Sequence, residues 1–185
     1  MQNPFETLGL SPTFGLDLAE LEQRQRDLNR AVHPDRHAGK GAAERRQALS
    51  RAMDINQAYR TLRDPASRAE ALFELLGASA LAERTFTDPA LLGEMLEQRE
   101  LLDEVRRDKD LKRLGELKQR MQERERQIVV DLTLAFEPLL GHAARDPQAS
   151  TPLSASALDQ TQRLFTELKY VRRFGEEVAA IEDEI

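Results

Sequence analysis

Residues 17–35 have the sequence DLAELEQRQRDLNRAVHPD, and this stretch decides the fold of the N-terminal half. Asp17 suits an N-cap, because its carboxylate can accept hydrogen bonds from the unpaired amides of the first helical turn. Pro34 disfavours helical backbone at the residue before it, so the predicted helix ends near Val32. Apolar residues at helical spacing give this helix one buried face. That face consists of Leu18, Leu21, Leu28 and Val32, with Gln25 in the same row.

A second helical pattern spans about residues 42–64. Two helices joined by a loop of about ten residues pack antiparallel, as a hairpin. Shorter helical segments at 5–8 and 66–76, the latter halted by Gly77, would pack beside it. Together these elements predict a first domain over residues 1–76. The predicted buried stripe of the second helix contains Leu49, Ala52, Ile55, Tyr59 and Leu62.

The second half of the chain predicts three further helices after a linker at residues 77–88. Asp88 can cap the first of them, with Pro89 in its first position. No strand-like alternation of useful length interrupts the helical period. We therefore expect an all-α fold, with a three-helix bundle over residues 89–185. The expected helices span 89–107, 109–140 and 154–184, and a loop occupies 141–152.

The first helix of this bundle has two distinct sides. Leu92 and Leu96 lie on a shoulder that also carries the charged residues Arg99, Glu100 and Asp103. Apolar residues bordered by charges can form a docking patch, but these two leucines fit packing on a neighbouring element equally well. The other side is most simply core, and it carries Leu91, Met95, Leu102 and Val105.

The last helix also offers two faces. Tyr170 and Phe174, four residues apart, share a face that differs from the core stripe. If exposed, such an aromatic pair would suit partner binding; if buried, it would widen the core. The core stripe is predicted to contain Leu164, Leu168, Val171, Gly175 and Val178.

The composition narrows the classes of function. The chain has 185 residues, a formal net charge of −6 and no cysteine, so it cannot form disulfides or thiolate metal sites. An acidic balance does not favour nucleic-acid binding. No apolar run approaches the roughly 20 residues that span a bilayer, and residues 1–5 do not resemble a signal peptide. We therefore expect a cytoplasmic protein with no membrane or nucleic-acid partner.

His33-Pro34-Asp35 lies between the two helices of the predicted hairpin and has four interpretations. A catalytic His33–Asp35 pair would lack the nucleophile or substrate pocket that such pairs need. A metal site of His33, Asp35 and His37 would need a regular helix, which Pro34 prevents. The tripeptide could also be a simple helix stop. As a docking turn, it would present one carboxylate on a fixed backbone, suited to the two hydrogen bonds of a partner arginine.

Basic residues around the tripeptide favour the docking interpretation. Arg24, Arg26 and Arg30 lie on the outer face of the preceding helix. A basic surface around one carboxylate suggests an acidic partner surface with an arginine at its centre. The basic residues beyond the tripeptide are Arg36, Lys40, Arg45 and Arg46.

Residues 1–76 resemble a J-domain. The resemblance rests on FETLGL at 5–10, the basic helix, the tripeptide and INQAYRTLRDP at 55–65. J-domains stimulate ATP hydrolysis by heat-shock chaperones of the seventy-kilodalton class, and the Asp of their tripeptide engages an arginine of the chaperone. The resemblance implies a triggering role for three residues and a docking role for three more. These are His33, Pro34 and Asp35 for triggering, and Arg24, Arg26 and Arg30 for docking.

The J-domain, linker and bundle together resemble the HscB family of iron–sulfur cluster assembly co-chaperones. The second anchor is LLGEMLEQRELLDE at residues 91–104, which is similar to the family's client-binding helix. The family's bundle binds the scaffold protein IscU, and its J-domain delivers IscU to the chaperone HscA. The resemblance therefore implies an IscU-like scaffold and an HscA-like chaperone as partners. The implied scaffold-binding residues are Leu92, Leu96, Glu97, Arg99, Glu100 and Tyr170.

The expected function is that of an adaptor that aids iron–sulfur cluster transfer, without catalytic activity, metal or cofactor of its own. Gly93 departs from the family, which often has Met or another apolar residue there, and the predicted loop at 141–152 is long for its position. One alternative is a J-domain co-chaperone for a different client. Another is a structural helical interaction protein with an inert tripeptide. An enzyme is the least expected class, because the sequence has no glycine-rich phosphate loop, no thiol and only three histidines.

Overall fold

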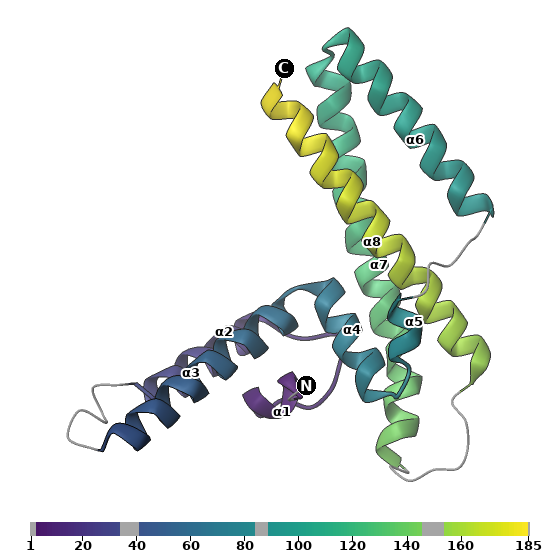
Figure 1. Cartoon of the computed structure of the whole chain (residues 1–185). Helices are drawn as coiled ribbons and strands as arrows, with labels where there is room; N and C mark the ends of the chain where they lie inside the picture. The colour runs from purple at the N-terminus through teal and green to yellow at the C-terminus, as the bar shows by residue number, and fades with distance from the viewer. Residues whose placement is uncertain (1–2, 34–40, 84–88, 146–153, 185) are drawn as a thin grey trace. The chain divides into compact units, whose positions relative to one another are not determined.

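A computed structural model describes residues 3–33, 41–83, 89–145 and 154–184. All the secondary structure in these ranges is helical, so the predicted all-α fold is confirmed (Figure 1). The helices are α1 (Pro4–Leu8), α2 (Leu18–Ala31), α3 (Ala42–Arg63), α4 (Pro65–Leu75), α5 (Ser79–Glu83), α6 (Pro89–Asp108), α7 (Leu111–Arg145) and α8 (Ala155–Glu184).

The described residues form two compact units. The first contains α1 to α4, most of α5 and the last residues of α7. The second contains α6, most of α7 and α8. Each unit therefore has a core of its own, built from the apolar stripes of its helices.

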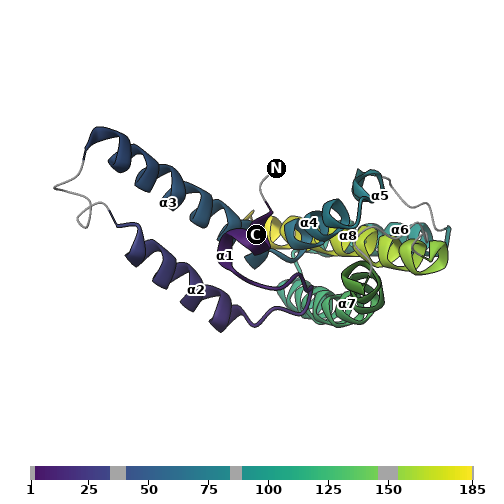
Figure 2. The same cartoon turned by 90° about the horizontal axis from the view of Figure 1, so that it is seen from below.

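The first unit is built on the hairpin of α2 and α3, with α1 packed against both helices (Figure 2). Asp17 caps α2 as predicted, because its Oδ1 accepts hydrogen bonds from the amides of Ala19 at 2.8 Å and Glu20 at 3.4 Å. Small side chains alternate with larger ones along the buried face of α3, which lets neighbouring helices approach closely. The buried residues of α3 are Ala48, Ile55, Ala58 and Leu62.

Two residues of the predicted hairpin core are exposed, and those predictions are wrong. Leu18 is 51% exposed because it is the first residue of α2, where few side chains surround it. Leu49 is 58% exposed, and Ala48 takes the buried position instead. A step of one residue turns a side chain by about 100° around a helix, so only one of these two neighbours can face the core.

Arg68 joins the loop after α1 to the corner between α3 and α4. Its guanidinium donates hydrogen bonds to the backbone carbonyls of Leu62 at 2.6 Å, Phe14 at 2.5 Å and Arg63 at 3.3 Å. It also lies 5.3 Å from the centroid of the Phe14 ring. Burial lowers the pKa of Arg68, and Asp64 raises it in part. The group still carries its charge at neutral pH, because arginine titrates far above that range.

Replacing Arg68 by leucine should destabilise the first unit. The substitution removes the guanidinium hydrogen bonds to three buried or partly buried backbone carbonyls, and we expect the free energy of unfolding to fall by about 3 kcal/mol. Urea unfolding followed by circular dichroism would measure this loss. Arg51→Leu, at an exposed position of α3, is the matched control and should change stability little. Equal effects of the two substitutions would contradict the role assigned to Arg68.

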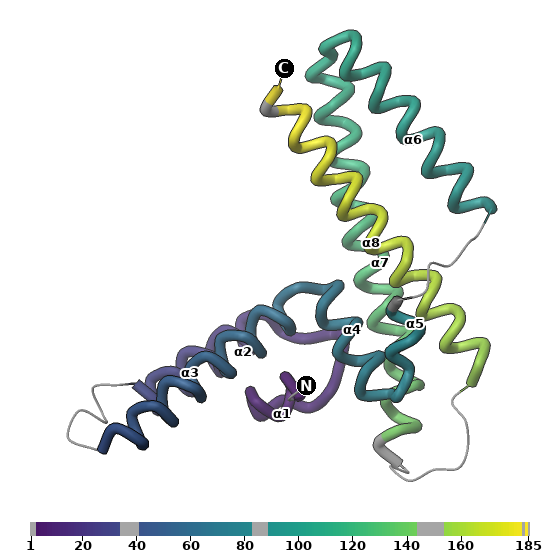
Figure 3. The backbone as a smooth tube through the Cα atoms, in the orientation of Figure 1, coloured from purple at the N-terminus to yellow at the C-terminus, as the bar shows by residue number. Residues whose placement is uncertain are grey.

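The second unit is a bundle of three helices, as predicted, and these helices run up, down and up (Figure 3). Arg99 pairs with Glu177 and Arg106 pairs with Glu184, each across 78 residues, so α6 and α8 run parallel. The separation of 78 residues is the same in both pairs because the two helices rise by the same distance per residue. The intervening α7 runs antiparallel to α8. Its ion pairs with that helix are Lys118–Glu182, Arg124–Glu167 and Glu125–Arg172.

The core of the bundle is wider than the stripe predicted for α8. Phe174 is 1% exposed, so the interpretation of a widened core is correct and that of an exposed aromatic pair is wrong. Phe165, which the prediction did not include, is also fully buried, whereas Leu164 is only half-buried. Aromatic side chains fill the centre because three helices leave more space between them than two.

Helix ends in the second half differ from the predictions. Lys109 has a φ of 52°, and Asp110 then caps α7 by accepting hydrogen bonds from the amides of Lys112 and Arg113. At its other end α7 continues to Arg145, so the predicted loop at 141–152 is wrong for residues 141–145. One glycine costs a helix only about 1 kcal/mol, which does not outweigh the packing of a long helix. The predicted cap Asp88 lies outside the described residues.

Candidate functional sites

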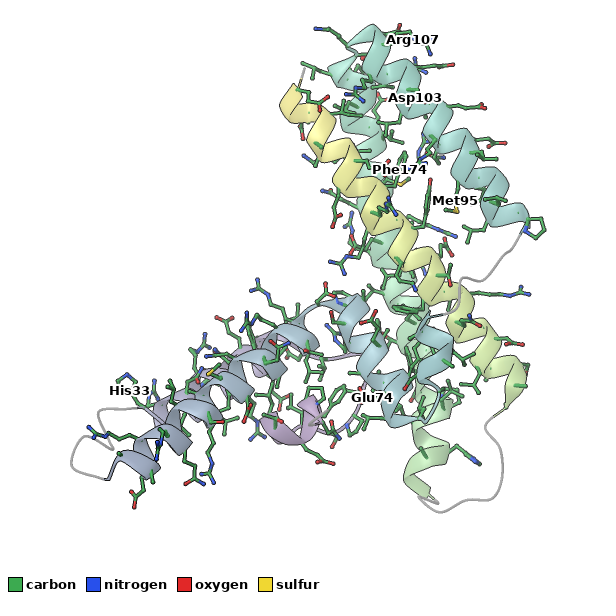
Figure 4. All side chains as sticks on the ribbon, viewed as in Figure 1. His33, Glu74, Met95, Asp103, Arg107 and Phe174 are labelled. Atoms are coloured by element: carbon green, nitrogen blue, oxygen red, sulfur yellow. The ribbon has the colours of Figure 1, made fainter. Side chains whose placement is uncertain are left out.

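The tripeptide follows directly from the end of α2. Val32 caps that helix, because its backbone amide donates a hydrogen bond to the carbonyl of Leu28 at 3.1 Å, and the next residue, His33, is exposed (Figure 4). Pro34 and Asp35 lie outside the described residues. The described part of this site therefore presents the imidazole of His33 at the far end of the hairpin from α1.

Each arginine of the predicted docking surface on α2 is paired within its own helix. Arg24 lies 3.9 Å from Glu20, and the Arg26–Glu22 distance is 2.7 Å. Arg30 lies 3.6 Å from Asp27, and all three arginine side chains are at least half exposed. Exposed pairs of this kind contribute only about 0.3–0.5 kcal/mol each. An acidic partner can therefore take over these guanidinium groups at little cost.

A small polar network sets the alignment of the hairpin near its middle. The side-chain amides of Gln25 and Asn29 both donate to Oδ1 of Asn56, each at 2.9 Å. Gln25 thus lies in the buried row, as predicted, but it serves there as a hydrogen-bond donor. Because these bonds have fixed partners, they oppose sliding of α2 along α3 and so fix the position of His33. The sequence signal for this network was the presence of two residues with side-chain amides, Gln25 and Asn29, one turn apart within an apolar stripe.

Removing the shared acceptor should loosen the hairpin. In Asn56→Ala, the amides of Gln25 and Asn29 lose their partner, at a cost of about 1–2 kcal/mol. We expect faster amide hydrogen exchange in the C-terminal half of α2. The exposed neighbour Gln57 supplies the control, because Gln57→Ala should leave these exchange rates unchanged. Unchanged exchange in both variants would show that apolar packing alone holds the alignment.

The predicted scaffold-binding residues form an exposed surface along α6. Leu92 is 48% exposed and Leu96 is 57% exposed, so neither leucine is packed into the core of the bundle. Helical spacing places Arg99 and Glu100 on the same side as these leucines and Glu97 further around the helix. Two apolar side chains with acidic and basic residues beside them are suited to a partner surface that combines apolar and charged groups.

Tyr170 belongs to α8, but a hydrogen bond to α6 holds its side chain beside the exposed surface of that helix. Its hydroxyl donates to the backbone carbonyl of Met95 at 3.1 Å, and its ring stacks on Phe174 with centroids 5.8 Å apart. Burial raises the pKa of Tyr170; Arg99 lowers it and Glu177 raises it to smaller extents. The hydroxyl therefore keeps its proton at neutral pH and acts as a stable donor to α6.

The raised pKa of Tyr170 can be measured in a Tyr59→Phe variant, in which it is the sole tyrosine. We expect its phenolate absorbance to appear at higher pH in the folded protein than in urea, because burial opposes ionisation. The unfolded chain then gives up this proton first, so the contribution of Tyr170 to stability falls as the pH rises above the unfolded-state pKa. Identical titration curves in the folded and unfolded protein would contradict this account.

Neither a metal centre nor a membrane span is found in the described ranges. Within residues 3–33, 41–83, 89–145 and 154–184, no three His, Asp or Glu side chains are grouped so that they could hold a metal ion. In the same ranges, no helix is both long and apolar enough to cross a bilayer.

Comparison with known families agrees with the two-part organisation. Residues 3–71 match the model of the DnaJ domain, which makes the chain a J-domain protein, the class that the hairpin and its tripeptide indicate. Residues 87–179 match the HSCB C-terminal oligomerisation domain. The chain therefore belongs to the HscB family of co-chaperones, and the resemblance seen in the sequence is confirmed.

Curated relatives and solved structures carry the same family name. The HscB homologue of Shewanella halifaxensis is 32% identical over 183 residues, covering 98% of this chain and 97% of the relative. The Bordetella pertussis homologue is 48% identical over 105 residues, 56% of this chain, and the chain thus spans 62% of that relative's length. Chaperone HscB from Vibrio cholerae has a TM-score of 0.72 at 29% identity, covering 99% of both chains. Human co-chaperone HscB has a TM-score of 0.77 at 20% identity, covering all of this chain and 84% of the human one, which shows a shared fold.

Proposed function

We propose that this co-chaperone binds an IscU-like iron–sulfur scaffold protein, delivers it to an HscA-like chaperone and stimulates that chaperone's ATPase. The observation that supports this proposal most directly is the presence of a DnaJ domain and an HscB C-terminal domain in one chain. In this proposal residues 1–76 act on the chaperone, residues 89–185 hold the scaffold, and residues 77–88 link them.

The proposed trigger is His33-Pro34-Asp35. Pro34 restricts the backbone, and Asp35 supplies a carboxylate that an arginine of the chaperone can hold through two hydrogen bonds. Arg24, Arg26 and Arg30 would attract an acidic chaperone surface, which favours rapid encounter more than tight binding. The adaptor would thus shift the chaperone towards its hydrolysis-competent conformation without taking part in the chemistry.

The proposed scaffold surface consists of exposed side chains of α6 together with Tyr170 of α8. Leu92 and Leu96 would supply the apolar contact at its centre, because protein interfaces have an apolar core inside a polar rim. Glu97, Arg99 and Glu100 would supply the charged rim. Arg99 is already held by Glu177 at 3.1 Å, so it is oriented before the partner arrives.

Single-turnover ATP hydrolysis by the HscA-like chaperone tests this function. The chain should accelerate hydrolysis, and the scaffold should increase the acceleration further. Asp35→Asn should lower the stimulation about tenfold, as expected for a loss of about 1.4 kcal/mol of coupling free energy. The double variant Leu92→Ala/Leu96→Ala should keep the basal stimulation and lose the added effect of the scaffold.

The outcomes separate the remaining functions. Stimulation that ignores the scaffold would indicate a J-domain co-chaperone for another client. No stimulation by the folded parent chain would leave a helical interaction protein. A folded Asp35→Asn variant that stimulates as well as the parent would refute the role of the tripeptide.

A further inference from the structure

The inner face of α6 is packed at one end and open at the other. Leu102 and Val105, in the C-terminal half of the helix, are 5% and 0% exposed. Leu91 and Met95 lie on the same face in the N-terminal half, yet both are only half-buried. Figure 1 shows that α6 and α7 meet at the C-terminal end of α6 and separate towards its N-terminus. The bundle is therefore incompletely filled beside the first turns of α6.

A cavity of about 250 Å³ occupies this open end, with walls from all three helices of the second unit. Its apolar lining comes from Leu91 and Met95 of α6, Met121 of α7 and Val171 of α8, together with the ring of Tyr170. Met95 points from α6 towards α8, as Figure 4 shows. The ion pair of Arg124 and Glu167 lies at the same cavity. An apolar interior beside fixed charges is the arrangement of a binding pocket.

The cavity is large enough for one large apolar side chain. A cavity of roughly 150 Å³ already holds a benzene-sized group, so this one can accept a leucine or a phenylalanine. Two of its walls are methionines, whose flexible side chains adapt to different shapes. Such a cavity selects for apolar character and size without demanding one particular residue.

We infer that this cavity receives one aliphatic or aromatic side chain of the iron–sulfur scaffold protein, an inference that rests on the proposed function. The exposed row of Leu92 and Leu96 adjoins the cavity, because each of these residues directly follows a residue of the cavity wall, Leu91 or Met95. A protein segment that covers the row therefore passes the mouth of the cavity. Seating a side chain there completes the bundle and adds a buried anchor to an otherwise shallow contact.

Gln98 offers a polar contact for the same segment. It contributes to the cavity wall, and its side-chain oxygen is buried with no hydrogen-bond partner among the described residues. A backbone amide of the incoming segment can donate to this oxygen after a rotation of the terminal amide group. The cavity would then recognise an apolar side chain together with the backbone that carries it.

Methyl-labelled methionine NMR on the full chain tests this inference. The chain has four methionines, and the described ones lie in the cavity (Met95 and Met121) or on α3 (Met53). On addition of the scaffold protein, we expect the signals of Met95 and Met121 to shift and that of Met53 to stay. Met121 decides the question, because it is only 7% exposed and a partner confined to the surface of α6 would not reach it.

A substitution at the mouth of the cavity gives a second test. Leu91→Trp should fill the cavity from its half-exposed rim and weaken scaffold binding about tenfold, measured by calorimetry. Leu134→Trp is the matched control, because Leu134 is 63% exposed on α7 and does not line the cavity. That variant should bind the scaffold like the parent.

Each outcome has a distinct meaning. Scaffold binding with an unmoved Met121 signal, or with equal affinity of the Leu91→Trp variant and the parent, would overturn the cavity inference and leave the proposed function standing. No binding of the scaffold by the parent chain would overturn both, through failure of the proposed function itself. A shifted Met121 signal, together with weaker scaffold binding by Leu91→Trp and unchanged binding by Leu134→Trp, would support both the cavity inference and the proposed function.

Discussion

Helix alignment is the constraint on which both units depend. Apolar faces hold helices together, but they tolerate sliding by a turn because one leucine replaces another at little cost. Directional bonds remove that freedom. In the first unit Asn56 accepts from two amides of α2, and in the second the Arg99–Glu177 and Arg106–Glu184 pairs hold α6 beside α8. The exposed ion pairs add little stability, but they select one alignment among several.

Alignment matters here because the position of each proposed surface depends on how one helix is aligned with its neighbour. The residue His33 projects from the end of α2, and its position depends on where α2 stops relative to α3. Tyr170 reaches the surface of α6 only because the two helices are in step at Met95. A shift of one turn, about 5.4 Å, would separate these groups while leaving the apolar cores largely intact.

The sequence predicted the helices well and the details of their packing less well. Helical periodicity and the Asp17 cap located α2 and α3, and the tripeptide with the α6 motif pointed to the family. Periodicity could not choose between Leu49 and Ala48, because both fit an amphipathic face and only the neighbouring helix selects the smaller one. It also could not find the cavity, which arises from divergence of α6, or the buried Arg68, since an arginine in a helix normally indicates a solvated face.

The contact between Arg68 and Phe14 spans 54 residues of sequence. During synthesis, the loop that carries Phe14 leaves the ribosome long before the guanidinium that will hold it. The stretch after α1 therefore lacks the contact of its Phe14 ring with Arg68 until α4 has emerged. Closing this contact is thus a late event in the assembly of the first unit, and the newborn chain is most open to misassociation in the interval before it.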